Sequence, residues 1–368
     1  MSGPLPRWAD VLVIPLINVA LAFLVAGGVV ALIGENPVAA LRVMIEGAFV
    51  YPGSLGYTLY YATNFVFTGL AVAVAFHARL FNIGGEGQAA IGGLGVMAVC
   101  LALDPYLPGV LVIPLAILGA ALFGGAWAFL PGFLQATRGS HVVITTIMFN
   151  FIAAGILVWL LTGPLIRAGQ STPQTRNIAP DATIPTVHEI ARVLGFEASS
   201  SPLNLSIFLA AAAAFGVWVL IWRTPFGFRL RTLGESEPAA RYAGVPVPSM
   251  VVATMVISGA LAGLMATNAV LGAQEKLINN FTAGFGFTGI AVALMGRAHP
   301  VGIVMASLLF GALYQGGTEL SFAYSTLDRN MVLVLQGLII LFSGALAHML
   351  DGPLSRLFAP RRRLASTP

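Results

Sequence analysis

The sequence predicts an all-α integral membrane protein. Of its 368 residues, 58% are hydrophobic and only 9% are charged, and the mean hydropathy is +0.89. Soluble domains carry roughly 25% charged residues, so this chain has too little charge to cover a soluble surface. Its apolar blocks reach the ~20 residues that a helix needs to cross the hydrocarbon core. They lack the strand alternation of an outer-membrane barrel.

Ten apolar stretches are predicted to cross the membrane. The first is too long for a signal-peptide core, so we expect an uncleaved span. The eighth and ninth are short and interrupted by Gly296 and Pro300, and they could also form one re-entrant pair. We therefore expect a single transmembrane domain, 1–368, of about ten helices with broken or re-entrant segments. The stretches are 11–33, 56–78, 83–103, 109–135, 141–162, 204–222, 248–270, 284–297, 301–317 and 331–349.

The basic residues predict the orientation. Ten spans put both termini on one side, and 12 of the 18 arginines and lysines fall there. By the positive-inside rule, both termini are expected in the cytoplasm of a bacterial inner membrane. The loop 163–203 is then extracytoplasmic, and the loop 223–248 is cytoplasmic. The basic tail 350–368 is also cytoplasmic and suits anionic membrane lipids, with no role in binding nucleic acid.

Several kinds of chemistry are missing from the sequence. Lys276 is the only lysine and follows no glycine-rich turn, so the chain has no phosphate-binding P-loop. If ATP drives the protein, another chain must hydrolyse it. The single Cys100 and the scattered histidines predict no metal site. No serine–histidine–aspartate arrangement is visible, so we expect a protein that is not an enzyme and holds no cofactor of its own.

The octet Phe81–Gln88 places polar side chains and glycines between two apolar runs. Each glycine weakens a helix by about 1 kcal/mol relative to alanine, so helix entry is expected to be delayed or irregular. The predicted orientation puts the octet at the cytoplasmic end of the second and third spans. It is either a packing turn locked by Glu86 or a hinge that lines an inner gate. The candidate gate residues are Asn82, Gly84, Gly85, Glu86, Gly87 and Gln88.

The cytoplasmic loop 223–248 contains a short predicted helix. Ser236 can cap its start, Pro238 suits its first turn, and Gly244 can end it. Its alanines form a flat face that the cleft of a partner could accept, although an ordinary linker is the alternative. The candidate coupling residues are Gly234, Glu235, Ser236, Glu237, Ala239, Ala240, Arg241 and Gly244.

Uncharged polar and aromatic residues recur inside the spans. Aromatic rings can stack on a planar ligand while amides bind its polar edge. The same residues can instead serve as packing contacts between helices. As a set they suit a neutral polar solute better than an ion. The candidate solute-path residues are Asn64, Thr68, Thr146, Asn150, Asn268, Phe285 and Phe287.

The extracytoplasmic loop 163–203 is rich in proline, and a short helix is expected at 186–194. The loop is either a passive connector or a docking ledge for a partner outside the membrane.

Three segments resemble one protein family. They are Phe81–Gly93, Gly234–Gly244 and Gly289–Pro300. The sequence resembles the permease subunits of bacterial ABC importers for simple sugars and branched-chain amino acids. Within them it is most similar to the nucleoside-type branch, which works with a basic-membrane-protein-type lipoprotein receptor. The resemblance covers about residues 40–350.

The resemblance implies an ABC importer permease fold and several partners. These are a second permease subunit (a paralogue or another copy), a cytoplasmic ATPase subunit that binds ATP and Mg²⁺, and an extracytoplasmic lipoprotein or periplasmic receptor. The loop 223–248 would then dock on the ATPase. Many ABC permeases carry Glu-Ala-Ala, three residues and Gly at this point. Here Pro238 replaces the glutamate, and Glu237 lies one residue earlier.

The function expected from this resemblance is import of a nucleoside or related small polar solute by alternating access. A simple sugar or a branched-chain amino acid is the alternative within the same machine. From other classes, a proton- or sodium-coupled transporter using Glu86 and Glu319 remains open, whereas a membrane enzyme is disfavoured by the missing catalytic groups.

Overall fold

The described part of the chain is helical. The computed structural model describes residues 14–166, 169–324, 326–327, 331, 333–338 and 341; the basic tail and most of the tenth predicted span lie outside them. Within these residues strand pairing is limited to two isolated bridges. The helices are α1 (Ile14–Leu32), α2 (Pro37–Phe49), α3 (Ser54–Phe76), α4 (Gly85–Leu103), α5 (Gly109–Arg138), α6 (Val142–Thr162), η2 (Pro180–Ala182), α7 (Val187–Val193), α8 (Ser206–Arg223), α9 (Pro225–Glu235), α10 (Glu237–Tyr242), α11 (Val247–Ala266), η3 (Thr267–Gln274), α12 (Phe285–Met295) and α13 (Pro300–Ala323).

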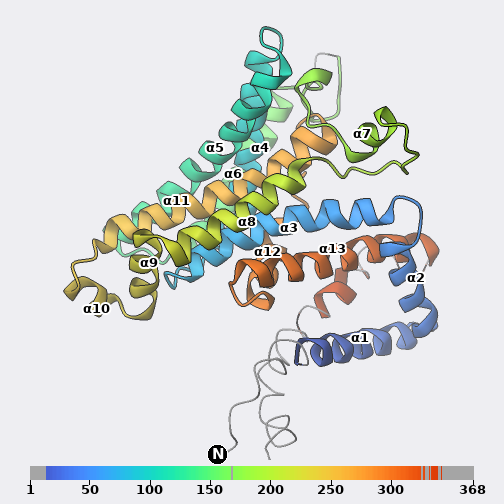
Figure 1. Cartoon of the computed structure of the whole chain (residues 1–368), viewed down its shortest axis with the longest axis horizontal. Helices are drawn as coiled ribbons and strands as arrows, with labels where there is room; N and C mark the ends of the chain where they lie inside the picture. Colours follow the sequence, from blue (N-terminus) through green and yellow to red (C-terminus); the bar gives the residue numbers. More distant parts are fainter. Residues whose placement is uncertain are drawn as a thin grey trace, which may run out of the picture. The chain divides into compact units, whose positions relative to one another are not determined.

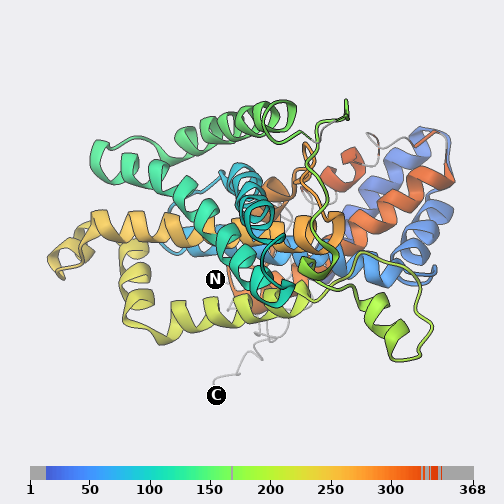
Figure 2. The same cartoon turned by 90° about the horizontal axis from the view of Figure 1, so that it is seen from above.

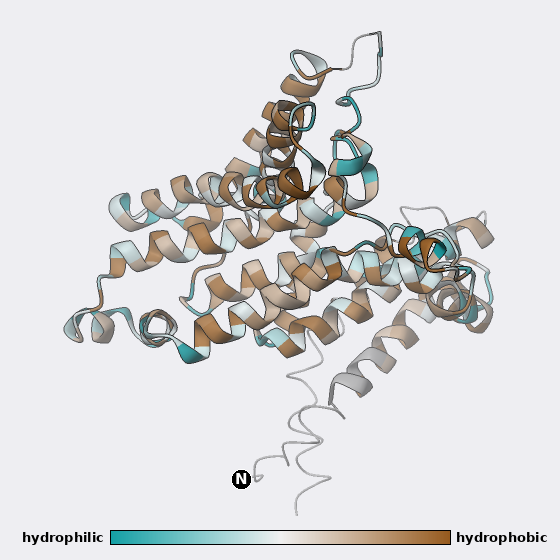
Figure 3. Cartoon of the chain, turned by 45° about the horizontal axis from the view of Figure 1, so that its top comes forward, coloured by the Kyte–Doolittle hydropathy of each residue, from teal (hydrophilic) through white to brown (hydrophobic). Residues whose placement is uncertain are grey.

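Seven described helices are long and apolar enough to cross a membrane: α3, α4, α5, α6, α8, α11 continued by η3, and α13. Figure 3 shows their apolar colouring against the more polar connections. The all-α membrane class is therefore confirmed. The short eighth span is α12. The ninth span is not short, because α13 runs over Pro300–Ala323. Proline at a first helical position starts a helix without losing a needed hydrogen bond, so Pro300 begins α13 instead of breaking it.

The sequence analysis missed two helices, α2 and α9. Asn36 precedes α2, and its side chain accepts from the N–H groups of Val38 (2.9 Å) and Ala39 (3.2 Å). Thr224 caps α9 in the same way, accepting from Gly227 N at 3.1 Å. Both helices have proline at their first position, so each carries a recognisable start signal. They were missed because both are too short to span a membrane.

The chain divides into two compact units. One comprises residues 48–315, and the other joins residues up to Gly47 with those from Gly316 onward. In the larger unit, α11 packs against α3, α4 and α5, while α6 contacts α4 and α8 contacts α3 (Figures 1 and 2). The short α12 packs against α3 and α4. In the smaller unit, α2 meets the end of α13 where Gly47 faces Glu319.

Close backbone contact holds α4, α5 and α11 together. A Cβ atom on Gly263 of α11 would lie 2.3 Å from the carbonyl oxygen of Ala120 on α5. A Cβ atom on Gly92 of α4 would lie 2.5 Å from the Cα of Gly263. Membrane helices gain little from hydrophobic transfer once inserted, so small residues that allow such close packing supply much of their association. Gly263 is thus a point where three helices meet.

We predict that Gly263→Val destabilises the protein. The added side chain would overlap the backbone of α5 at Ala120, and overpacking of this kind costs about 1–3 kcal/mol. The measurement is the thermal unfolding midpoint of the purified protein in detergent. Gly216→Val on α8 is the matched control, because a Cβ atom there has no neighbour within 4 Å. Equal midpoints for the two variants would contradict the packing argument.

Candidate functional site: a polar junction between helix starts

The octet lies deep among the helices. Asn82 donates to the hydroxyl of Ser258 at 2.8 Å, and Ser258 is the twelfth of the 20 residues of α11. The N–H of Gly87 donates to Asn150 Oδ1 at 2.9 Å, and Asn150 is the ninth of the 21 residues of α6. With a rise of 1.5 Å per residue, Asn150 is about 12 Å inside the start of α6. The expectation of a turn at the cytoplasmic membrane edge is therefore corrected.

Two amides hold the octet in shape. Asn82 donates to Gln88 Oε1 at 2.9 Å, and Gln88 donates back to Asn82 Oδ1 at 3.0 Å. Asn82 Oδ1 also accepts from the N–H of Gly84 at 2.9 Å. The hydroxyl of Ser258 donates onward to the carbonyl of Ala71 at 2.6 Å, which ties the octet to α11 and α3. Both amides are buried, and these bonds satisfy polar groups that would be costly to leave unpaired in an apolar layer.

Asn150 fastens the octet to α6. Its side-chain amide donates to the carbonyl of Ile83 at 3.0 Å while its oxygen accepts from Gly87. One side chain thus satisfies a backbone acceptor and a backbone donor at the point where α4 begins. Thr146, one turn earlier on α6, is fully buried near Gly84 and bonds to its own helix at Val142.

Glu86 joins the starts of two helices. It lies in the first turn of α4, and its carboxylate accepts from the N–H groups of Gly284 (2.9 Å) and Gly286 (2.8 Å) at the start of α12. The backbones also touch, since a Cβ atom on Gly286 would lie 2.2 Å from the nitrogen of Glu86. We call the octet, Asn150, Ser258 and Gly284–Gly286 the polar junction.

A second set of amides joins η3 to α3. Asn268 donates to Asn64 Oδ1 at 2.9 Å and to the carbonyl of Tyr60 at 3.0 Å. Asn268 belongs to η3, an eight-residue π-helix, and such helices are rare and frequent at functional sites. Thr68, one turn after Asn64, is buried against Gly289 of α12.

The two phenylalanines of the predicted solute path differ in environment. Phe285 is buried in an aromatic cluster, with its ring centroid 5.3 Å from that of Phe65 and 5.3 Å from that of Tyr314. Phe287 is 47% exposed. Only Phe287 among the predicted solute-path residues presents an accessible surface in this conformation. The amides and hydroxyls make contacts between or within helices, and their role in solute passage stays a prediction.

The loop 223–248 contains two short helices, α9 and α10. Ser236 caps α10 by accepting from Ala239 N at 3.4 Å, and Gly244 (φ +75°) follows its end, as predicted. Ala240 is fully buried, and a Cβ atom on Gly234 would lie 2.1 Å from the carbonyl oxygen of His77. Gly234 therefore packs against the residues that follow α3, and Ala240 is buried, so neither residue forms the outer surface of the loop.

The outer surface of α10 carries an aromatic residue that the sequence analysis missed. Tyr242 is 95% exposed, and beside it Arg241 forms an ion pair with Glu237 at 2.7 Å. The available signal was a tyrosine directly before Ala243-Gly244 in a polar loop. Exposed tyrosine is a residue type enriched at protein interfaces.

The segment 163–203 forms an ordered strap over η3. Backbone bonds join Thr175 to Leu277 (3.1 Å) and Ile184 to Leu271 (3.1 Å). Arg176 in the strap pairs with Asp104 at the end of α4 through bonds of 2.9 and 2.5 Å. Burial tends to raise the pKa of Asp104, but hydrogen bonds from Arg176 and the N–H of Ala179 outweigh it and hold this pKa below its ordinary value.

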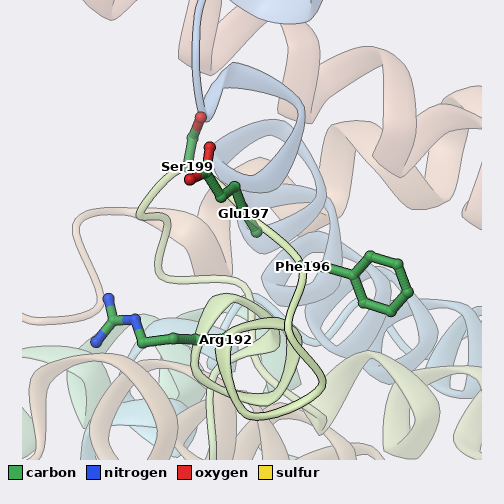
Figure 4. A pocket seen from close by; sticks show the side chains of 5 residues that line it. Arg192, Phe196, Glu197 and Ser199 are labelled. Atoms are coloured by element: carbon green, nitrogen blue, oxygen red, sulfur yellow. The ribbon is translucent and has the colours of Figure 1, made fainter.

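The predicted short helix of this segment is confirmed as α7, with a capping box between Thr186 and Glu189. The hydrogen bond from the N–H of Thr186 lowers the pKa of Glu189. After α7 the chain forms a surface pocket. Figure 4 shows Arg192 and Phe196 pointing to opposite sides, with Glu197 and Ser199 close together; Ala198 completes the lining.

Comparison with known proteins identifies the family. Residues 54–344 match the family described as the branched-chain amino acid transport system permease component. The chain belongs to this family. It is a multi-pass membrane permease subunit of an ABC transporter and not an enzyme, and such permeases work with ATPase and substrate-binding partners.

Three relatives align along most of the permease. A guanosine ABC transporter permease protein of Bacillus subtilis is 35% identical, covering 90% of this chain and 92% of the relative. A nucleoside ABC transporter permease protein of Lactococcus lactis is 32% identical over 82% of this chain and 83% of the relative. A glucose ABC transporter permease protein of Haloferax volcanii is 31% identical over 89% and 86%.

We predict that Asn150→Leu lowers the stability of the permease. The change keeps the approximate size but leaves the N–H of Gly87 and the carbonyl of Ile83 unpaired, at about 1–3 kcal/mol per buried group. Thr145→Val is the control, because that hydroxyl bonds only within its own helix. Thermal unfolding in detergent is the measurement. If Asn150→Leu lowered the unfolding midpoint no more than Thr145→Val does, Asn150 would not be needed to hold the octet in place.

A pH-dependent effect is expected at Asp104. A carboxyl whose pKa is lowered by folding contributes stability above its unfolded pKa, and this contribution is lost as pH falls through the folded value. The unfolding midpoint should therefore fall as the medium is acidified below about pH 4. Asp104→Asn should lower the unfolding midpoint at pH 7 and should reduce the fall of the midpoint below about pH 4. Glu46→Gln, which breaks the exposed pair with Arg42, should do neither. If the midpoint of Asp104→Asn fell with acid as steeply as that of the wild type, Asp104 would not be the source of the pH dependence.

Proposed function

We propose that this permease imports a nucleoside or a related uncharged polar solute. The observation that supports this most is the chemistry of the buried polar groups, which are mainly amides and hydroxyls beside an accessible phenylalanine. Such groups suit a solute with a planar ring and neutral polar edges. The guanosine and nucleoside permeases among the relatives support the same substrate class. The glucose permease favours a simple sugar as the second candidate, and the family description favours a branched-chain amino acid.

The proposed mechanism is alternating access powered by a partner. ATP and Mg²⁺ bind to a cytoplasmic ATPase subunit, which contacts the exposed side of α9 and α10. α11 starts at Val247, three residues after Gly244, and carries Ser258 into the polar junction. A displacement of α10 therefore acts on α11, and through Ser258 on the octet. In this proposal the octet serves as the hinge or inner gate.

The remaining partners follow from the proposed orientation, with both termini in the cytoplasm of a bacterial inner membrane. A second permease subunit, a paralogue or another copy, completes the path. An extracytoplasmic lipoprotein or periplasmic receptor delivers the solute to the side that carries the strap and α7. Exposed apolar side chains at the end of α7, Val193, Leu194 and Phe196, offer it a contact surface.

Reconstitution tests the substrate and the energy source together. The permease is placed in liposomes with the ATPase, second permease and receptor from its genomic neighbourhood. Uptake of labelled guanosine, glucose and leucine is measured with and without ATP inside the vesicles. We expect ATP-dependent guanosine uptake. ATP-dependent uptake of glucose or leucine alone would replace the nucleoside proposal with the corresponding alternative.

We predict that Tyr242→Ala weakens coupling. We expect Tyr242 to be one of the few interface residues whose truncation costs 1 kcal/mol or more, so association with the ATPase should fall by at least about fivefold. Solute-stimulated ATPase activity and uptake should fall together while the unfolding midpoint stays the same. Tyr106→Ala, which removes another exposed tyrosine (83%) after α4, is the control. Full coupling in Tyr242→Ala would remove this residue from the contact surface.

A further inference from the structure

Two helices begin against each other at the polar junction. α4 starts at Gly85 and α12 at Phe285, and their first turns are in backbone contact through Gly286 and Glu86. Each α-helix leaves N–H groups unpaired at its start and carries about half a positive charge there. Two such ends in contact repel each other unless an anion lies between them.

Glu86 supplies that anion from within the chain. Its two carboxylate oxygens each accept one N–H group of α12, and its own backbone belongs to the first turn of α4. One negative charge therefore faces two helix ends of about +0.5 each, so the charges sum to near zero. Among the described residues, no ion pair competes for this carboxylate.

The surroundings of Glu86 indicate what it faces. The residue is only half-buried, and its neighbour Gly87 contacts Asn150 near the middle of α6. An ionised side chain at this depth is costly against lipid and lies almost always toward a water-filled cavity or another protein surface. Phe287, in the first turn of α12, is exposed. We therefore expect this face to border the permeation path.

We propose that Glu86 is a built-in counter-ion that keeps this stretch of the path electrically neutral and thereby suits it to uncharged solutes. Without it, the two helix ends would form a site for small anions. This inference rests on the proposed import function. A turn that only packs would need the shape of the Glu86 side chain. The role proposed here needs its negative charge.

Uptake by the reconstituted transporter tests the charge. Glu86→Gln keeps the shape of the side chain but loses the charge, and uptake should fall about tenfold, the effect of weakening one charged hydrogen bond. Glu86→Ala should also lose uptake, and formate in the medium should restore part of it by occupying the vacated position. Glu46→Ala is the matched control and should behave as the wild type. Full uptake by Glu86→Gln would overturn the proposal.

Solute charge provides a second readout. An excess of the nucleoside 5′-monophosphate should inhibit uptake by Glu86→Gln at least several-fold more than uptake by the wild type. Equal inhibition would overturn the link to solute charge.

Unfolding in detergent separates this inference from the proposed function. Formate and bromide should raise the unfolding midpoint of Glu86→Ala, because a ligand that binds only the folded state stabilises it. The wild type and Glu86→Gln should not respond. If the wild type imports no nucleoside, the proposed function fails while this measurement still decides the role of Glu86. If Glu86→Ala does not fold, uptake by Glu86→Gln decides it. A folded Glu86→Ala without an anion response would overturn the proposal.

Discussion

The structure depends on satisfying the backbone of helices that begin inside an apolar layer. Each helix start leaves N–H groups that lipid cannot pair. At the start of α4, Asn82 accepts from Gly84 and Asn150 accepts from Gly87. At the start of α12, Glu86 accepts from Gly284 and Gly286. The polar residues of the octet are thus needed because two helices start at depth, and their side chains replace the water that would otherwise solvate these ends.

The same contacts explain why glycine dominates around the polar junction. A bidentate contact between Glu86 and α12 requires the two backbones to touch, and any side chain on Gly286 would overlap α4. Around Gly263 the requirement is different, because three helices approach there without polar bonds. Close packing there substitutes for the hydrophobic driving force that helices lack once they are in lipid. The polar junction is therefore stabilised by hydrogen bonds to helix starts, whereas the region around Gly263 is stabilised by close packing.

The sequence predicted the membrane class, most span positions, the α10 cap and the short α7, because each has a local signal in hydropathy or capping residues. It could not predict the depth of the octet. Loop positions were inferred by assuming that each apolar stretch crosses fully, and this assumption fails when α12 starts beside α4. Nor could it separate Phe285 from Phe287, because burial depends on Phe65 and Tyr314 from distant helices.

The position of α11 links the two functional regions physically. This helix begins three residues after Gly244, contacts Asn82 through Ser258, and continues as η3, where Asn268 donates to Asn64. A rigid helix transmits displacement along its axis, whereas a π-helical segment has weaker regularity and can change register. In the proposed mechanism, motion that starts at α10 reaches the octet through the regular part of α11. The π-helical η3 lies between this part of α11 and the strap that is held by Asp104 and Arg176.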